Sequence, residues 1–132
     1  MKKRLKEELG KLGILIVYLF GSKASGRGSQ LSDVDIGIVC KDSMQRMDTR
    51  ILYDRLFELF SYLYPHWKLD IVFLQTAPLA FQFFATRDGK VIFEGDPKLR
   101  ADYENRAIQQ YLDFRPVLDF FDIIAGERYA ET

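Results

Sequence analysis

Residues 14–39 read ILIVYLFGSKASGRGSQLSDVDIGIV, in which two apolar stretches flank a segment rich in Gly and Ser. The first stretch, ILIVYLF, is rich in β-branched and aromatic residues, a composition typical of a buried strand. Residues 21–32 contain one large apolar residue, Leu31, and predict a loop, or a loop with a short helix starting at Ser22. The second stretch, DVDIGIV, alternates polar and apolar side chains, as a strand with one buried face does. Two strands joined by a Gly- and Ser-rich loop are therefore the centre of the predicted fold.

The remaining sequence adds helices and two more strands around this centre. Helices are expected over residues 2–12, 48–64 and 76–86 and from Pro97 to about Phe114, where Pro116 bends or restarts the last helix; strands are expected over 68–74 and 90–95. The inner stripe of the helix that Asp48 caps is expected to be Leu52, Leu56, Leu59 and Leu63. This order of elements predicts the α/β (α+β) class, a small mixed β-sheet covered by helices, in one domain over residues 1–132.

Composition narrows the classes of function. Lys and Arg together number 19, as do Asp and Glu, so the net charge is zero and no stable binding to nucleic acid or to a membrane is expected. The single Cys40 excludes an internal disulfide and fits a reducing compartment. The chain begins MKKR and has an early apolar run, as secretion signals do, but Glu7 and Glu8 interrupt the basic stretch, and cleavage would remove the first strand. We therefore expect a cytoplasmic protein.

Three carboxylates stand at positions that suit metal-assisted phosphoryl chemistry. Asp33 and Asp35 are two residues apart on one predicted strand, so both side chains point to the same face, and Asp70 lies on the next predicted strand. Transfer of a nucleotide builds charge on the entering and the leaving oxygen, and two Mg²⁺ ions stabilise both. Carboxylate oxygens are ligands that Mg²⁺ prefers. Asp33, Asp35 and Asp70 are therefore the candidate ligands of two Mg²⁺ ions.

The pair Gly21-Ser22 is the candidate site for the phosphates of a nucleotide. Gly allows a close approach of the backbone to phosphate, and Ser adds a hydroxyl beside N–H groups that are free at a helix start. A D-x-D pattern alone is most often a solvated strand end, and Gly-Ser alone is an ordinary turn. Their combination at this spacing after an apolar strand rarely arises by chance.

The pattern G-S-x₁₀-D-x-D resembles the signature of the DNA polymerase β-type nucleotidyltransferase superfamily. From residue 2 to about 125, including YLDFRP at 111–116, the chain resembles the prokaryotic minimal nucleotidyltransferase (MNT) group. The resemblance implies that fold, with Asp33 and Asp35 binding both metals. It also implies that Asp70 is the third carboxylate, which supports the attack, and that Gly21 and Ser22 hold the β- and γ-phosphates.

The resemblance has one departure and implies a partner. Members of the group usually read GS-x-A-R-G, whereas Ser25 stands here in place of the Arg, with Lys23 and Arg27 as nearby cations. Lys23 is therefore a further candidate for nucleotide binding. Similar MNT proteins are the antitoxins of HEPN–MNT toxin–antitoxin pairs. The resemblance implies transfer of AMP from ATP to a tyrosine of a HEPN-domain ribonuclease toxin, in a hetero-oligomer with that toxin.

Two other functions and several aromatic residues stay open at this stage. The alternatives are transfer to a small molecule such as an aminoglycoside, and an antitoxin that acts by binding alone. His66 is expected in a surface turn. Phe81, Phe83 and Phe84 are candidates for the core or for a platform that stacks a nucleobase. The C-terminal aromatic residues belong either to the core or to an interface with a partner; they are Tyr103, Tyr111, Phe114, Phe120 and Phe121.

Overall fold

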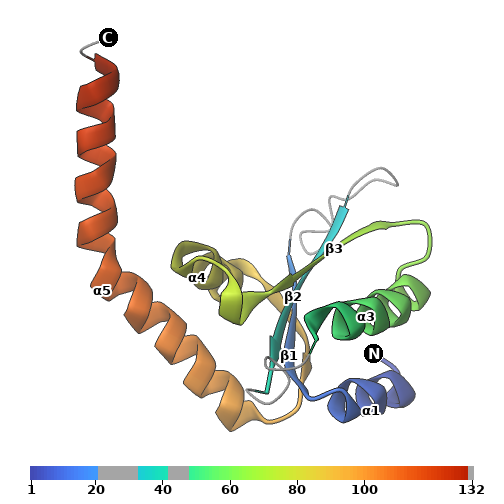
Figure 1. Ribbon diagram of the computed structural model, residues 1–132. Coiled ribbons are helices and arrows are strands. Elements are labelled where there is room, and N and C mark those ends of the chain that lie inside the picture. Colours follow the sequence, from blue (N-terminus) through green and yellow to red (C-terminus); the bar gives the residue numbers. More distant parts are fainter. Residues whose placement is uncertain (21–32, 42–47, 131–132) are drawn as a thin grey trace.

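The computed structural model describes residues 1–20, 33–41 and 48–130, with the backbone alone at Asp33 and at 127–130. Its elements are α1 (Lys3–Lys11), β1 (Ile14–Phe20), β2 (Asp33–Cys40), α3 (Thr49–Leu63), β3 (Lys68–Phe73), the 3₁₀ turn η1 (Leu74–Thr76), α4 (Leu79–Asp88), β4 (Lys90–Glu94) and α5 (Pro97–Ala130) (Figure 1). The strands form one sheet in the order β3-β2-β1-β4. The pair β2–β3 is parallel and the other two pairs are antiparallel. The predicted class, a small mixed sheet covered by helices, is confirmed.

The helix ends follow from local chemistry. The carboxylate of Asp48 accepts a hydrogen bond of 2.9 Å from the backbone N–H of Arg50, and the carboxylate of Asp96 accepts one of 2.9 Å from Lys98. These bonds satisfy N–H groups that have no partner within the first turn of a helix. Gly13, after the end of α1, has φ = 77°, which is unstrained for glycine and turns the chain directly into β1.

One face of the sheet is covered by α1 and α3 and is apolar throughout. Val34, Ile36 and Ile38 of β2 point to this face, as their alternation predicted, and pack against Leu56 and Phe60 of α3. The predicted inner stripe of α3 is correct for Leu52 and Leu56, which are buried, whereas Leu59 and Leu63 are partly buried. Phe60, which is completely buried, was absent from the predicted stripe. This face forms the larger core.

The opposite face of the sheet is covered by α4 and the first part of α5. Tyr18 of β1 packs there against Tyr103 and Ala107 of α5. The Tyr18 hydroxyl donates a hydrogen bond of 2.8 Å to Glu104, and the Tyr103 hydroxyl donates one of 2.9 Å to the side-chain oxygen of Gln82 in α4. Two buried tyrosines thus fix α5 to the sheet and to α4 through both packing and hydrogen bonds.

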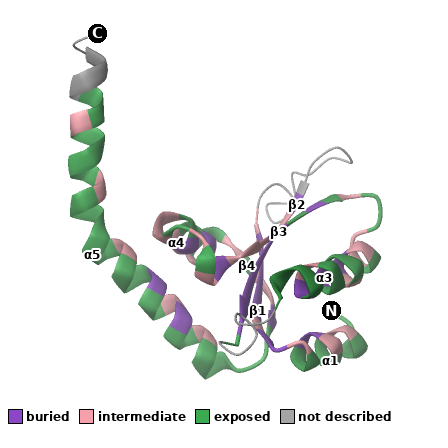
Figure 2. Cartoon of the chain, viewed as in Figure 1, coloured by how far each residue is buried: buried purple, intermediate pink, exposed green. Residues whose placement is uncertain are grey.

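The last helix is longer than the sequence predicted. We expected it to run to about Phe114, with Pro116 bending or restarting it, and α5 instead continues to Ala130 as one helix with Pro116 inside it. Proline lacks the N–H that an interior helix position donates, so it kinks or ends a helix. Here the helix continues, and the axis of α5 changes direction along its length (Figure 1). Beyond this bend α5 leaves the body of the protein and is mostly exposed (Figure 2). None of the described helices offers an apolar stretch of the length that crossing a membrane requires.

Candidate functional site

The strand register brings two of the predicted carboxylates together. Asp35 of β2 is the Cα partner of Asp70 of β3, and Phe20 of β1 is the Cα partner of Asp35. Partners in register point to the same face of a sheet, on strands about 4.8 Å apart. Because Val34 and Ile36 point to the face covered by α1 and α3, Asp35 and Asp70 point to the face covered by α4 and α5. Asp35 is half-buried and Asp70 is exposed.

This pair fits the chemistry of a Mg²⁺ site. Both side chains supply hard carboxylate oxygens from adjacent strands, which is the kind of donor that Mg²⁺ takes from proteins. Asp33 is described in its backbone only and has Lys68 as its Cα partner. Among the side chains that the structure describes, no three of the types His, Cys, Asp and Glu gather closely enough to hold a metal ion. The described part of the site therefore consists of Asp35 and Asp70.

The predicted phosphate-binding residues Gly21, Ser22 and Lys23 lie outside the described residues, as do Ser25 and Arg27. β1 ends at Phe20, directly before Gly21-Ser22 in the sequence. Since Phe20 is opposite Asp35, the Gly-Ser pair follows the strand end that lies beside the carboxylates. The predicted order along the chain, strand then Gly-Ser then D-x-D strand, thus corresponds to neighbouring strands in the sheet.

Next to the carboxylates lies an aromatic pair. Phe81 was a candidate for the core or for a nucleobase platform, whereas Phe20 was not assigned to the site by the sequence analysis. The rings of Phe20 and Phe81 meet edge to face, with centroids 5.5 Å apart and an interplanar angle of 76°. A Cβ placed on Gly37 would lie 2.9 Å from a ring carbon of Phe20 and 3.0 Å from a methyl group of Leu74. Gly37 therefore makes room for the Phe20 ring to lie across β2. A glycine inside a strand, two residues after Asp35, was the signal for this close approach.

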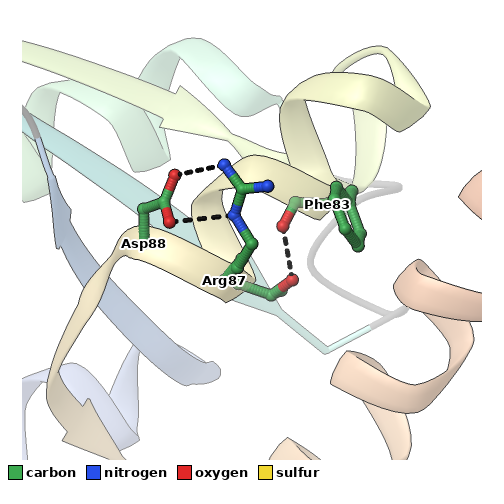
Figure 3. Close-up of polar contacts among 4 residues, drawn as sticks. Phe83, Arg87 and Asp88 are labelled. Atoms are coloured by element: carbon green, nitrogen blue, oxygen red, sulfur yellow. Dashed lines mark hydrogen bonds and ion pairs between the residues drawn. The ribbon is translucent and has the colours of Figure 1, made fainter.

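A second aromatic cluster joins α4 to α5 and involves the other two phenylalanines of α4. The ring of Phe83 stacks on Tyr111 with centroids 4.3 Å apart and an interplanar angle of 11°. The Arg87 guanidinium carbon lies 4.8 Å from the ring centroid of Phe84. The same guanidinium group forms an ion pair with Asp88 at 2.9 Å (Figure 3). The hydrogen bond from Arg87 lowers the pKa of Asp88 below its usual value. Phe83 and Phe84 thus pack α4 on α5, whereas Phe81 lies beside Phe20.

The polar contacts at the base of α5 stabilise the face that carries the carboxylates. Arg100 forms ion pairs with Glu94 of β4 at 3.0 Å and with Glu104 at 3.7 Å. Burial, and after it the hydrogen bond to Glu104, raise the pKa of Tyr18 far above its ordinary value. Burial also raises the pKa of Tyr103. Both phenols are therefore neutral hydrogen-bond donors over the physiological pH range, and their contacts hold α5 in place.

The sequence profile of the family described as "Polymerase beta, Nucleotidyltransferase" matches residues 3–98. The chain belongs to the polymerase β nucleotidyltransferase family. The match begins at α1 and ends in the first turn of α5, so it includes all four strands and both described carboxylates. The protein is thus a nucleotidyltransferase, and the expected fold is confirmed at the level of the family.

Chains of three solved structures share the fold. A toxin–antitoxin structure with AMP-PNP superposes with a TM-score of 0.66 at 22% sequence identity, over 90% of this chain and 98% of that chain. The MntA–HepT toxin–antitoxin structure gives 0.59 at 20% identity, over 93% and 99% of the two chains. A structure of the tri-AMPylated Shewanella oneidensis HEPN toxin in complex with its MNT antitoxin gives 0.59 at 20% identity, over 94% and 99%. No curated protein sequence matches this chain.

Proposed function

We propose that this nucleotidyltransferase transfers AMP from ATP to a hydroxyl of a protein, a tyrosine of a HEPN-domain toxin, and thereby acts as the antitoxin of that toxin. The observation that carries the proposal is the register pair of Asp35 and Asp70 on adjacent strands of a polymerase β-type sheet. Chains of the same fold occur in toxin–antitoxin structures, one with AMP-PNP and one with an AMPylated HEPN toxin. The complex of an MNT antitoxin with its HEPN toxin supports the choice of a HEPN-domain toxin as the partner.

In this proposal the three carboxylates divide into two roles. Asp33 and Asp35 hold two Mg²⁺ ions, and Asp70 is the third ligand, on the acceptor side. Bound Mg²⁺ supplies Lewis-acid stabilisation of the charge that develops on the phosphate oxygens. The exposed carboxylate of Asp70 also offers an oxygen that accepts a hydrogen bond from the incoming hydroxyl and so orients it. In the transfer, the acceptor oxygen forms a bond to the α-phosphorus, the bond to the bridging oxygen breaks, and pyrophosphate leaves while the hydroxyl proton passes to solvent.

The remaining predicted contacts concern the nucleotide. Gly21 and Ser22 hold the β- and γ-phosphates, and Lys23 adds a positive charge where the usual arginine of the group is replaced by Ser25. Because Gly21-Ser22 follows the strand end beside Asp35, a triphosphate held there has its α-phosphate near the carboxylates. ATP is thus the donor substrate, and both ATP and the toxin are proposed to be cytoplasmic.

The partner surface is proposed to lie on the C-terminal part of the chain. Of the C-terminal aromatic residues, Tyr103 is buried and Tyr111 stacks on Phe83, so these two belong to the fold. Phe114, Phe120 and Phe121 are exposed. The exposed rings lie beyond the part of α5 that packs on the sheet, which supports a hetero-oligomer in which the toxin covers them.

Replacing Asp70 with Asn tests the proposal most directly. If Asp70 serves the acceptor side, Asp33 and Asp35 still hold the ion that accompanies the triphosphate. ATP affinity in the presence of Mg²⁺ should then change by less than about threefold, while transfer of labelled AMP to the HEPN-domain partner falls by about a hundredfold or more. Asp54→Asn, an exposed Asp on the other side of the sheet, is the matched control and should keep both properties.

The same pair of variants separates this proposal from an antitoxin that acts by binding alone. Under binding alone, Asp70→Asn protein would silence the ribonuclease as well as wild type does. A loss of ATP binding as large as the loss of transfer would instead place Asp70 among the residues that hold the nucleotide. Transfer at the wild-type rate in Asp70→Asn would refute its assignment.

A further inference from the structure

The part of α5 that leaves the body has an unusual distribution of side chains. Between residues 112 and 126, the exposed large apolar side chains are Leu112, Phe114, Val117, Phe120, Phe121 and Ile123. Phe121 and Ile123 are each 61% exposed. The charged residues Arg115, Asp119 and Asp122 follow one another at spacings of four and three, so they lie on one strip. The projecting part of the helix thus has one polar strip and is otherwise largely apolar.

The apolar side chains of residues 112–126 form an arc around the helix axis, called the apolar arc. This arc is wider than one neighbouring helix covers. Successive residues of an α-helix are about 100° apart around the axis, so residues nine apart, such as Leu112 and Phe121, lie on opposite sides. Phe114 and Ile123 are likewise nine apart. In this projection the exposed apolar residues span about 200°, and half-buried Leu118 extends the span to about 240°, whereas one packed side needs an apolar stripe of roughly 100°. Asp113 is the exception inside the arc, and its carboxylate accepts a hydrogen bond of 3.0 Å from Gln109.

One edge of this arc continues the seam by which α5 packs on its own domain. Tyr103, Ala107 and Tyr111 are four residues apart and face the sheet and α4. Phe114, Leu118 and Phe121 follow at spacings of three and four and therefore continue the same side of the helix, beyond the end of the domain. Apolar contact along α5 is thus continuous in sequence from the intramolecular interface into the projecting part.

We propose that residues 112–126 insert into an apolar groove between helices of the partner protein, with the strip of Arg115, Asp119 and Asp122 left in solvent. A second copy of this chain lying alongside α5 would cover one side of each helix and leave the other side exposed. A groove formed by at least two helices covers both sides, as in helix-in-groove recognition. The ion pair of Arg115 with Asp119 at 3.9 Å, with both side chains more than half exposed, fits the solvent side. The identity of the partner as the HEPN toxin rests on the proposed function.

This placement also joins docking to chemistry. The first part of α5 packs on the sheet face that carries Asp35 and Asp70, so the projecting part belongs to the same side of the molecule. A partner that encloses the helix is held on the side from which an acceptor hydroxyl reaches the carboxylates. Docking at a distance from the site leaves the site itself open to a tyrosine of the bound protein.

The consecutive residues Phe121, Asp122 and Ile123 provide a matched test, in which each is replaced with Ser in turn. Phe121 and Ile123 lie about 160° apart around the helix, and Asp122 lies on the polar strip. The affinity of each full-length variant for the HEPN-domain protein proposed as the partner is measured by calorimetry without ATP, and circular dichroism confirms the helix content. Phe121→Ser and Ile123→Ser should each weaken binding by about thirtyfold, and Asp122→Ser by less than about threefold.

The pattern of losses decides between the arrangements. If only one of Phe121→Ser and Ile123→Ser weakens binding, the helix lies on a surface and the groove is refuted. If neither does, the interface is elsewhere. A wild-type dimer in light scattering that becomes monomeric in both variants would assign the arc to a second copy. Binding that follows the expected pattern without any AMP transfer by the wild-type chain would overturn the proposed function and leave the groove standing.

Discussion

The two faces of the sheet carry different tasks, and the neighbouring residues Asp35 and Ile36 show the difference most clearly. Ile36 points to the face covered by α1 and α3 and is completely buried. Asp35 points to the face covered by α4 and α5, is half-buried, and has Asp70 beside it. The first face is apolar along its whole length, whereas on the second the apolar packing around Tyr18 gives way to carboxylates at the end of β2. One strand thus stabilises the fold with one set of alternate residues and presents the candidate site with the other.

Replacing Asp35 with Asn should have the largest effect, a loss of activity without a loss of stability. If Asp35 holds the metal ions, its loss removes several kcal/mol of stabilisation of the transition state, and AMP transfer should decrease by about a thousandfold or more. The melting temperature should stay the same or rise, because the change relieves like-charge repulsion with Asp70 in the metal-free protein. Labelled-AMP transfer and thermal unfolding are measured on the same preparation.

The matched control for this prediction is Ile36→Ala on the other face. Removing a buried Ile side chain should lower the free energy of unfolding by about 2–5 kcal/mol, as measured by urea denaturation, while the folded fraction keeps its specific activity. The division of tasks between the faces fails if Asp35→Asn destabilises the protein as much as Ile36→Ala does. It also fails if Asp35→Asn transfers AMP at the wild-type rate.

Gly37→Ala tests whether packing on the second face positions the site. The added Cβ would meet Phe20 at 2.9 Å and Leu74 at 3.0 Å, so the Phe20 ring has to move. Overpacking of this kind costs about 1–3 kcal/mol of stability. Because Phe20 is opposite Asp35 and directly precedes Gly21-Ser22, ATP affinity should also weaken, by roughly tenfold. Gly10→Ala is the control, because its Cβ meets nothing within 4 Å.

Unchanged ATP affinity in folded but destabilised Gly37→Ala protein would contradict the positioning role. Phe20→Leu in the Gly37→Ala background gives a second measure, because the smaller side chain leaves space for the new methyl group. Recovery of stability together with ATP affinity would show that the ring, and not the backbone of β2, transmits the effect. Recovery of stability alone would separate the packing of this face from nucleotide binding.

The strands and their faces could be predicted because alternation in DVDIGIV fixes which side chains share a side. The pairing of Asp35 with Asp70 is a register, and it depends on how β2 and β3 align across a helix connection, which local patterns do not determine. The same holds for Phe20 and Phe81, which come from distant segments. The expected end of the last helix near Phe114 was too early, because α5 continues through Pro116 to Ala130, and a proline residue can kink a helix without ending it. The roles of Asp33, Gly21, Ser22 and Lys23 remain predictions.

Tyr18→Phe should have the smallest effect at neutral pH and a distinct signature in alkali. The variant loses a hydrogen bond to Glu104, which lowers stability by about 1 kcal/mol. In the wild type, burial and that bond raise the pKa of Tyr18 in the folded state, while the unfolded chain releases the proton near pH 10. Above about pH 10 the folded state therefore binds more protons than the unfolded state, and the free energy of unfolding falls by about 1.4 kcal/mol per pH unit for this group. Tyr103, whose pKa burial also raises, adds a loss of the same sign. Urea denaturation at pH 8 and pH 11 should thus show a smaller decrease in the free energy of unfolding for Tyr18→Phe than for wild type. Equal decreases would mean that the pKa of Tyr18 is the same in the folded and unfolded states. In that case the Tyr18 hydroxyl does not fix α5 to the sheet through its proton.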